Sequence, residues 1–189
     1  TNTSSTTFAI ITHADGKKNI ELSRIDSLSK LHTIVVADLS GTGEASSFNS
    51  KRFDNLAKLH TYSRAALWLG ETVMGNWVEE LRGIVKWIQD EKKGSSIYFY
   101  GYKESALAGV FLNALEESFK ETVTYSMPMS LQFDQRKGVD YFGLNVYIPN
   151  ILPWGDIQLA LAMGNGNYTI FQQVSIAGRL LNEDEKTQY

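Results

Sequence analysis

The chain has 189 residues, of which 43% are hydrophobic and 21% are charged, a composition typical of one globular domain with a full hydrophobic core. Its net charge is −3 and it has no large basic block, which argues against nucleic acid as the main partner. Cysteine is absent, which excludes disulfides, thiolate metal sites and a cysteine nucleophile, and no apolar run is long enough to span a bilayer.

The first half of the chain predicts a strand, a helix and a second strand. The apolar run Phe8–Thr12 reads as a buried strand, and apolar residues at helical spacing favour a helix within Asn19–Leu31. The β-branched run Thr33–Asp38 predicts the next strand, which leads into a glycine-rich turn at 39–44. The polar stretch 45–58 is expected to be a long surface loop.

The second half predicts a further alternation of helices and strands. Met74–Asp90 places its apolar residues on one helical face, and basic residues and Gly94 follow it, as is typical of a helix C-terminus. The remaining expected elements are a strand at Ile97–Tyr100, a helix from the next turn to about Glu117, a strand at Glu121–Tyr125, an irregular excursion at 127–155, a helix at Ile157–Met163, a strand at Tyr168–Val174 and the start of a helix at 182–186.

Strands that alternate with helices indicate an α/β fold with a mainly parallel sheet covered on both faces. No internal repeat and no low-complexity linker interrupts the pattern. We therefore expect a flexible N-terminus at 1–7 and a single domain at 8–189.

The segment Ser96–Ala108 predicts a strand, a tight turn and a helix start, which is the setting of the motif G-x-S-x-G. In that motif the central serine is a nucleophile on a sharp turn. Aligned on Gly101, this chain has Lys103 at the central position and Ser105 at the second glycine position. Lysine cannot do the work of the serine.

Other segments follow a known order around this turn: His13–Lys17 after the first strand, Val36–Glu44 after the second, Arg64–Trp77 before the turn and Ile148–Ile157 after it. In this order the chain resembles the α/β-hydrolase fold, specifically bacterial esterases of the acetyl-xylan-esterase or dipeptidyl-peptidase-like kind. The resemblance implies a three-layer sandwich that is shortened at the C-terminus. We expect it to be the C-terminal domain of a larger or tandem esterase-like protein, with a small stand-alone relative as the alternative. The resemblance also implies that His13 marks the oxyanion loop.

The catalytic triad that the resemblance implies cannot be assembled in family order. A serine must be activated by a histidine that a carboxylate orients. The nucleophile position is Lys103, and the residues that follow the strand Tyr168–Val174, at 175–179, contain no carboxylate. The three histidines, His13, His32 and His60, all precede the turn.

Two residues of the turn allow alternative readings. Lys103 is either a Schiff-base nucleophile, which Glu104 would oppose by holding it charged, or the remnant of a lost site that reaches to solvent. Ser105 is either a displaced nucleophile or a first-turn residue that bonds backbone N–H groups. We favour the second reading for both.

Other polar positions give weaker signals. The turn at 39–44 could cradle a phosphate, but Ser46 stands at the third glycine position of G-x-G-x-x-G, so a structural turn fits better. Asp38 could be a general base, but the resemblance implies that it is structural and ties down this turn. His13 and Asp15 could share a metal, but no third ligand accompanies them. We therefore predict neither a cofactor nor a metal site.

Several aromatic residues could form a binding surface for sugar rings or for a partner protein, or belong to the core. They are Tyr141, Phe142, Tyr147 and Trp154 in the irregular excursion and Trp68 in another loop.

The sequence favours a degenerate esterase-like domain that is non-catalytic and acts in structural support or partner binding. The alternatives are an active carboxylic-ester hydrolase of the acetyl-xylan type with a displaced or completed site, and a carbohydrate-binding module. The expected partner is another esterase domain, a second copy of the chain, or a carbohydrate. The resembling esterases are often exported, which favours a periplasmic or secreted location.

Overall fold

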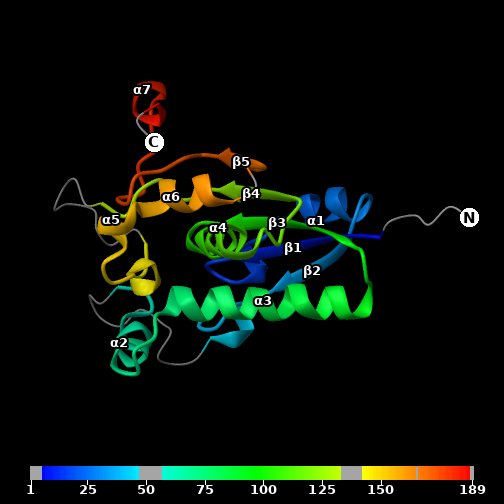
Figure 1. Cartoon of the computed structure of the whole chain (residues 1–189), viewed down its shortest axis with the longest axis horizontal. Coiled ribbons are helices and arrows are strands. Elements are labelled where there is room, and N and C mark those ends of the chain that lie inside the picture. Colours follow the sequence, from blue (N-terminus) through cyan, green and yellow to red (C-terminus); the bar gives the residue numbers. More distant parts are fainter. Residues whose placement is uncertain (1–5, 47–56, 133–141, 165, 188–189) are drawn as a thin grey trace, which may run out of the picture.

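The structure is a computed structural model that describes residues 6–46, 57–132, 142–164 and 166–187. Its centre is a five-stranded sheet in the order β2-β1-β3-β4-β5, and every strand pair is parallel (Figure 1). The strands are β1 (Thr7–His13), β2 (Thr33–Ala37), β3 (Ser96–Tyr102), β4 (Glu121–Tyr125) and β5 (Tyr168–Phe171). The α/β class and the parallel sheet that the sequence predicts are thus confirmed.

Helices connect successive strands, as parallel pairing requires. They are α1 (Leu22–Ser29), α2 (His60–Trp68), α3 (Val73–Glu91), α4 (Glu104–Glu116), α5 (Ile151–Trp154), α6 (Asp156–Met163) and α7 (Glu183–Lys186), with 3₁₀ turns η1 (Lys17–Asn19), η2 (Gly43–Ala45) and η4 (Leu144–Val146). None of the helices in the described ranges has the length and apolarity needed to cross a membrane. The last helix, α7, projects away from the sheet (Figure 1).

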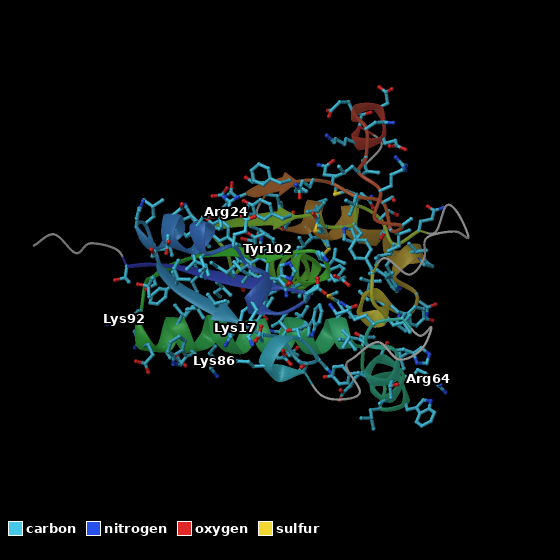
Figure 2. The ribbon with its side chains drawn as sticks, turned by 180° about the vertical axis from the view of Figure 1, so that it is seen from behind. Lys17, Arg24, Arg64, Lys86, Lys92 and Tyr102 are labelled. Carbon is cyan, nitrogen blue, oxygen red and sulfur yellow. The ribbon has the colours of Figure 1, made fainter. Side chains whose placement is uncertain are left out.

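The two faces of the sheet are covered unequally. One face packs against α3, α4 and α6 in the larger core, around the fully buried Trp77, Phe99 and Leu107. The other face meets α1, and its smaller core contains Ile11, Leu28 and Tyr100. Figure 1 shows the long α3 running along the sheet, and Figure 2, seen from behind, shows Arg24 of α1 near Tyr102.

Parallel register brings the turns after β1 and β3 together. His13, the last residue of β1, pairs with Tyr102, the last residue of β3, and their rings stack with centroids 5.6 Å apart. Because parallel strands end at the same edge of a sheet, the loop after β1 lies beside the turn from β3 into α4. This edge holds the residues that the sequence singles out.

Two glycines let α4 approach β3 closely. A Cβ added to Gly101 would lie 2.5 Å from the Cα of Ala106, and one added to Gly109 would lie 2.0 Å from the ring of Phe99. Side chains cannot be accommodated at such distances without moving the backbone or a buried ring. The glycine of the turn is therefore required by packing, whatever its neighbours do.

Some expected boundaries are wrong. The last strand ends at Phe171 rather than Val174, because Gln172 has a φ of 52° that breaks the extended backbone, and Val174 forms only isolated bridges. Helix α1 starts at Leu22 rather than Asn19 because the 3₁₀ turn η1 precedes it. The excursion at 127–155 contains η4 and α5. Residues 47–56 and 133–141 of the expected loop and excursion lie outside the described residues.

Helix α2 was not expected at all. Its first turn follows Leu59, whose backbone is left-handed (φ 61°) and whose side chain provides no cap. Only Ser63 and Ala66 of this helix are buried, so its apolar periodicity is weak. Trp68, which we expected in a loop, is the last residue of α2 and is 83% exposed.

Candidate functional site

Lys103 is the residue at which β3 turns into α4. Its backbone has φ 56° and ψ −133°, a region that residues with a side chain rarely adopt and that costs about 1–3 kcal/mol. The Lys103 N–H donates to the carbonyl of Tyr125 over 2.8 Å, and the Ala106 N–H donates to the Lys103 carbonyl over 3.1 Å. Strand β4 and helix α4 thus hold the strained turn in place.

The Lys103 side chain joins a charge cluster that comprises Asp15, Lys58 and Lys103, hereafter the Asp15 cluster. The Lys103 Nζ lies 2.7 Å from Asp15 Oδ2, and the Lys58 Nζ lies 2.6 Å from Asp15 Oδ1. Lys58 Nζ also donates to the carbonyl of Ala14. Two ammonium groups therefore share one carboxylate at the edge where β1 and β3 end, each about a quarter to a third exposed.

The charge cluster sets the protonation of its neighbours. Burial disfavours the charged form of Asp15, but hydrogen bonds and charge from Lys103 and Lys58 outweigh it and lower the pKa of Asp15 to about 2. Burial also lowers the pKa of His13. The charge of Asp15 opposes this shift, and the charges of Lys103 and Lys58 add to it. His13 Nδ1 accepts the Asp15 N–H over 2.9 Å, so the neutral ring carries its proton on Nε2.

Ser105 is fully buried in the first turn of α4. Its hydroxyl donates to the carbonyl of Tyr102 over 2.8 Å and accepts from the hydroxyl of Thr12 over 3.1 Å. The expected bonds to backbone N–H groups are absent among its described contacts, because the side chain points back to the carboxyl ends of β1 and β3. Both of its partners are groups of the sheet, and neither is a histidine.

Glu104, the neighbour of Lys103, anchors another segment. Its side chain is buried, and Oε1 accepts the Gly143 N–H over 2.9 Å. We expected Glu104 to hold Lys103 charged, and the structure gives Asp15 as an ion-pair partner of Lys103. The Gly143 segment borders an apolar cavity of about 590 Å³, whose walls include Phe142, Leu144, Val146, Tyr147, Ile148, Ile151, Leu152, Pro153 and Ile176.

The position for a triad acid, after β5, holds no carboxylate before Glu183. Glu185 of α7 lies further along and is bound by Arg179, whose Nη2 is 2.6 Å from Glu185 Oε1. Hydrogen bonds from Arg179 and from the backbone of Asn182 lower the pKa of Glu185 to about 2. This acid is therefore used to fix α7.

The turn after β2 is structural in its contacts. Asp38 Oδ1 accepts the Lys17 N–H over 2.6 Å and Oδ2 accepts the Glu44 N–H over 2.8 Å, so Asp38 ties two turns together as expected. Within the described ranges, no group of three or more histidine, cysteine, aspartate or glutamate side chains is placed to hold a metal ion.

The aromatic residues of the excursion are split between core and surface. Phe142 is 3% exposed, whereas Tyr147 is 52% and Trp154 is 76% exposed. Tyr141 lies outside the described residues. Two exposed aromatic side chains are thus present in this segment, which a sugar-binding surface would need.

The sequence suggested Asp15 only as a possible metal ligand with His13, and its role as a partner of Lys103 was missed. That role could have been found, because Asp15 follows β1 and parallel strands β1 and β3 end at one edge. Lys58 gives no such signal, since it precedes an unpredicted helix and reaches the edge from a distant part of the chain.

Comparison with solved structures places this geometry in a known fold. A candidate acetyl xylan esterase from Bacteroides fragilis superposes with a TM-score of 0.63 at 13% identity, over 89% of this chain and 52% of the other. Est1E from Butyrivibrio proteoclasticus, solved with ferulic acid, matches with a TM-score of 0.48 at 16% identity, over 67% of this chain and 45% of the other. The chain thus spans about half the length of these structures.

The first of these matches shows that the chain has the α/β-hydrolase type of fold that the sequence predicts. The sequence itself matches no known family model and no curated protein. At such low identity the likeness concerns the fold alone, and the chemistry must be argued from the residues of this chain.

Proposed function

We propose that this chain is a non-catalytic domain of esterase-like fold that supports or binds a partner. The observation that carries the proposal is the side chain at the strained turn. A nucleophile there must present a lone pair, but Lys103 is an ammonium group beside the ionised carboxylate of Asp15, which favours the protonated form. The strained backbone is retained, and the reactive group that would use it is replaced.

Ser105 supports the same proposal. Its hydroxyl is buried away from any substrate, and its partners among the described residues, Thr12 and the Tyr102 carbonyl, include no base that could take its proton. A displaced serine nucleophile would need both. The alternative of an active carboxylic-ester hydrolase therefore requires this turn to rearrange.

An esterase assay tests the proposal. We expect p-nitrophenyl acetate to be hydrolysed no faster than in buffer, and we expect a fluorophosphonate probe to leave Ser105 unlabelled. Lys103→Ala and Ser105→Ala serve as matched variants that should give the same background rate. Turnover that disappears in either variant would overturn the proposal, as would covalent labelling of the serine.

Carbohydrate binding is the second candidate, favoured by the exposed rings of Tyr147 and Trp154. Titration with xylo-oligosaccharides while tryptophan fluorescence is followed would detect stacking on Trp154. Trp154→Ala should abolish the signal, and Trp87→Ala, near the other end of helix α3, should not. If the tryptophan fluorescence of the unmodified chain does not change during the titration, carbohydrate binding is excluded.

A further inference from the structure

The apolar cavity bordered by the Gly143 segment is a site separate from the turn at Lys103. Most of its walls come from the segment 142–153, and Leu131 and Ile176 complete them. Neither Lys103 nor Ser105 is among the residues that line it. The cavity is therefore not the position that a nucleophile at the turn would serve.

The lining changes in character from its buried to its exposed residues. Leu131, Phe142 and Ile176 are buried and wholly apolar. Tyr147 and Asn150, which also line the cavity, are exposed and have polar side-chain atoms. A ligand would therefore place an apolar body among the buried side chains and a polar group near the exposed ones.

The absence of charge from the lining restricts the chemistry of that ligand. None of the described residues that line the cavity has a charged side chain. An acid or an amine would lose its water there without gaining a counter-ion, which is costly. Tyr147 and Asn150 can each donate and accept hydrogen bonds without a charge. The lining therefore favours a neutral molecule.

The volume restricts the size of the ligand. An apolar cavity of about 150 Å³ is enough to bind one benzene molecule. At about 590 Å³ this cavity lies within the range of small-molecule sites in proteins, which is roughly 300–1,000 Å³. It has room for a molecule of roughly ten to twenty non-hydrogen atoms.

Hydrogen bonds from other parts of the chain hold the wall of the cavity in place. The Gly143 N–H donates to Glu104 Oε1 over 2.9 Å, and the Leu144 N–H donates to the Lys58 carbonyl over 3.0 Å. The Ser63 hydroxyl donates to the Leu144 carbonyl over 3.1 Å. A wall that is already ordered loses little conformational freedom when a ligand binds, which favours binding.

We infer that this cavity binds a neutral, predominantly apolar small molecule with one uncharged polar group, the class to which medium-chain alcohols and esters belong. The inference deepens the proposed function, because it gives a non-catalytic domain a ligand. It rests on that function only in that the ligand is held and not hydrolysed.

The neutral dye N-phenyl-1-naphthylamine, which fluoresces more strongly in apolar surroundings, tests binding and its location. We expect a saturable rise in fluorescence with the unmodified chain. Leu144→Trp, which fills part of the cavity, should raise the dissociation constant of the dye at least about tenfold. Leu159→Trp is the matched control, because Leu159 lines a separate apolar groove between α3, α4 and α6, and it should leave the constant unchanged. Circular dichroism would check that both variants fold.

Competition on the unmodified chain tests the chemical class of the ligand. Decanol and decanoate have the same chain length and differ in charge at pH 7. We expect decanol to displace the dye at a concentration at least about tenfold lower than decanoate, because the carboxylate has no counter-ion in the cavity. This comparison holds even if the tryptophan variant does not fold.

Three outcomes would overturn the inference. They are no saturable rise in fluorescence up to about 100 µM protein, an unchanged dye affinity in folded Leu144→Trp, and displacement by decanoate as readily as by decanol. Incubation with methyl decanoate separates the inference from the proposed function. Release of decanoate would contradict the lack of catalysis and leave the binding of a neutral ligand standing.

Discussion

At the scale of the residue, Lys103 combines a strained backbone with a stabilising ion pair. Glycine adopts positive φ without strain, whereas any other residue does not. The strain and the ion pair with Asp15 can therefore be separated by two substitutions at this one position.

We expect Lys103→Gly to be more stable than Lys103→Ala by about 1 kcal/mol. Both variants lose the contact with Asp15, but only glycine relieves the backbone. Urea unfolding followed by circular dichroism would give the two free energies. Equal stabilities would mean that the turn relaxes when the lysine is lost.

The carboxylate of Asp15 makes stability depend on pH. Its pKa is about 2 in the folded chain against 3.8 for a free aspartate, so the unfolded chain binds more protons between these values. The contribution of Asp15 is fully present above about pH 4 and is lost as the pH falls toward 2. Asp15→Asn should therefore be less stable than the unmodified chain at pH 6 and approach it at pH 2.

Chemical denaturation from pH 2 to pH 6 would show this convergence. Glu185→Gln is the matched control, because Glu185 also has a pKa of about 2 but pairs with Arg179 in α7. The free energy of unfolding of the Glu185→Gln variant should still fall between pH 6 and pH 2 by the part that Asp15 contributes. Parallel curves for Asp15→Asn and the unmodified chain would contradict the charge cluster.

At the scale of the element, the packing of β3 against α4 explains why the turn is built as it is. Gly101 lies against Ala106, and nothing larger fits. Gly83, by contrast, lies on the exposed side of α3 with no atom within 4 Å of where a Cβ would be. The two glycines have opposite effects on stability.

We expect Gly101→Ala to destabilise the chain by about 1–3 kcal/mol through overpacking. Gly83→Ala should instead stabilise it by about 0.5–1 kcal/mol, because alanine loses less backbone freedom in a helix. Thermal or urea unfolding would measure both. If Gly101→Ala leaves the free energy of unfolding unchanged, α4 can move away from the sheet.

The elements differ in how far the sequence predicts them, for physical reasons. Helix α3 matches its expected range closely because its apolar periodicity is strong, and strand β4 does so because its central residues are β-branched. Helix α2 was not predicted because it buries only two small side chains, which leave little apolar periodicity in the sequence. Part of the site could be predicted from the sequence. The turn at Lys103 follows from the local sequence pattern, whereas the ion pair between Lys58 and Asp15 depends on tertiary structure.

At the scale of the whole molecule, the unequal faces of the sheet predict unequal local stability. Nine residues of α4 are buried between sheet and neighbouring helices, whereas Leu28 is the one buried residue of α1. Elements with few buried contacts open without global unfolding. The two helices should therefore differ in amide protection.

Hydrogen exchange would measure that difference. We expect amides in the middle of α4 to exchange only through global unfolding, and amides of α1 to exchange at least about tenfold faster. The long helix α3, which buries seven residues, should behave like α4 and serve as an internal reference. Equal protection of α1 and α4 would mean that the thinly covered face is held more firmly than its packing suggests.

The central place of β1 in the sheet has a consequence for the nascent chain. Of the described strands β1 is made first, yet one of its two neighbours, β3, begins only at Ser96. Until the ribosome has released that segment, Ile10 and Ile11 of β1 have a partner strand on one side only. The emerging polypeptide thus exposes apolar surface and an unpaired strand edge for much of its synthesis. Chaperones commonly bind chains in this state. The sheet around β1 is therefore expected to be completed only after Ser96–Tyr102 has left the ribosome.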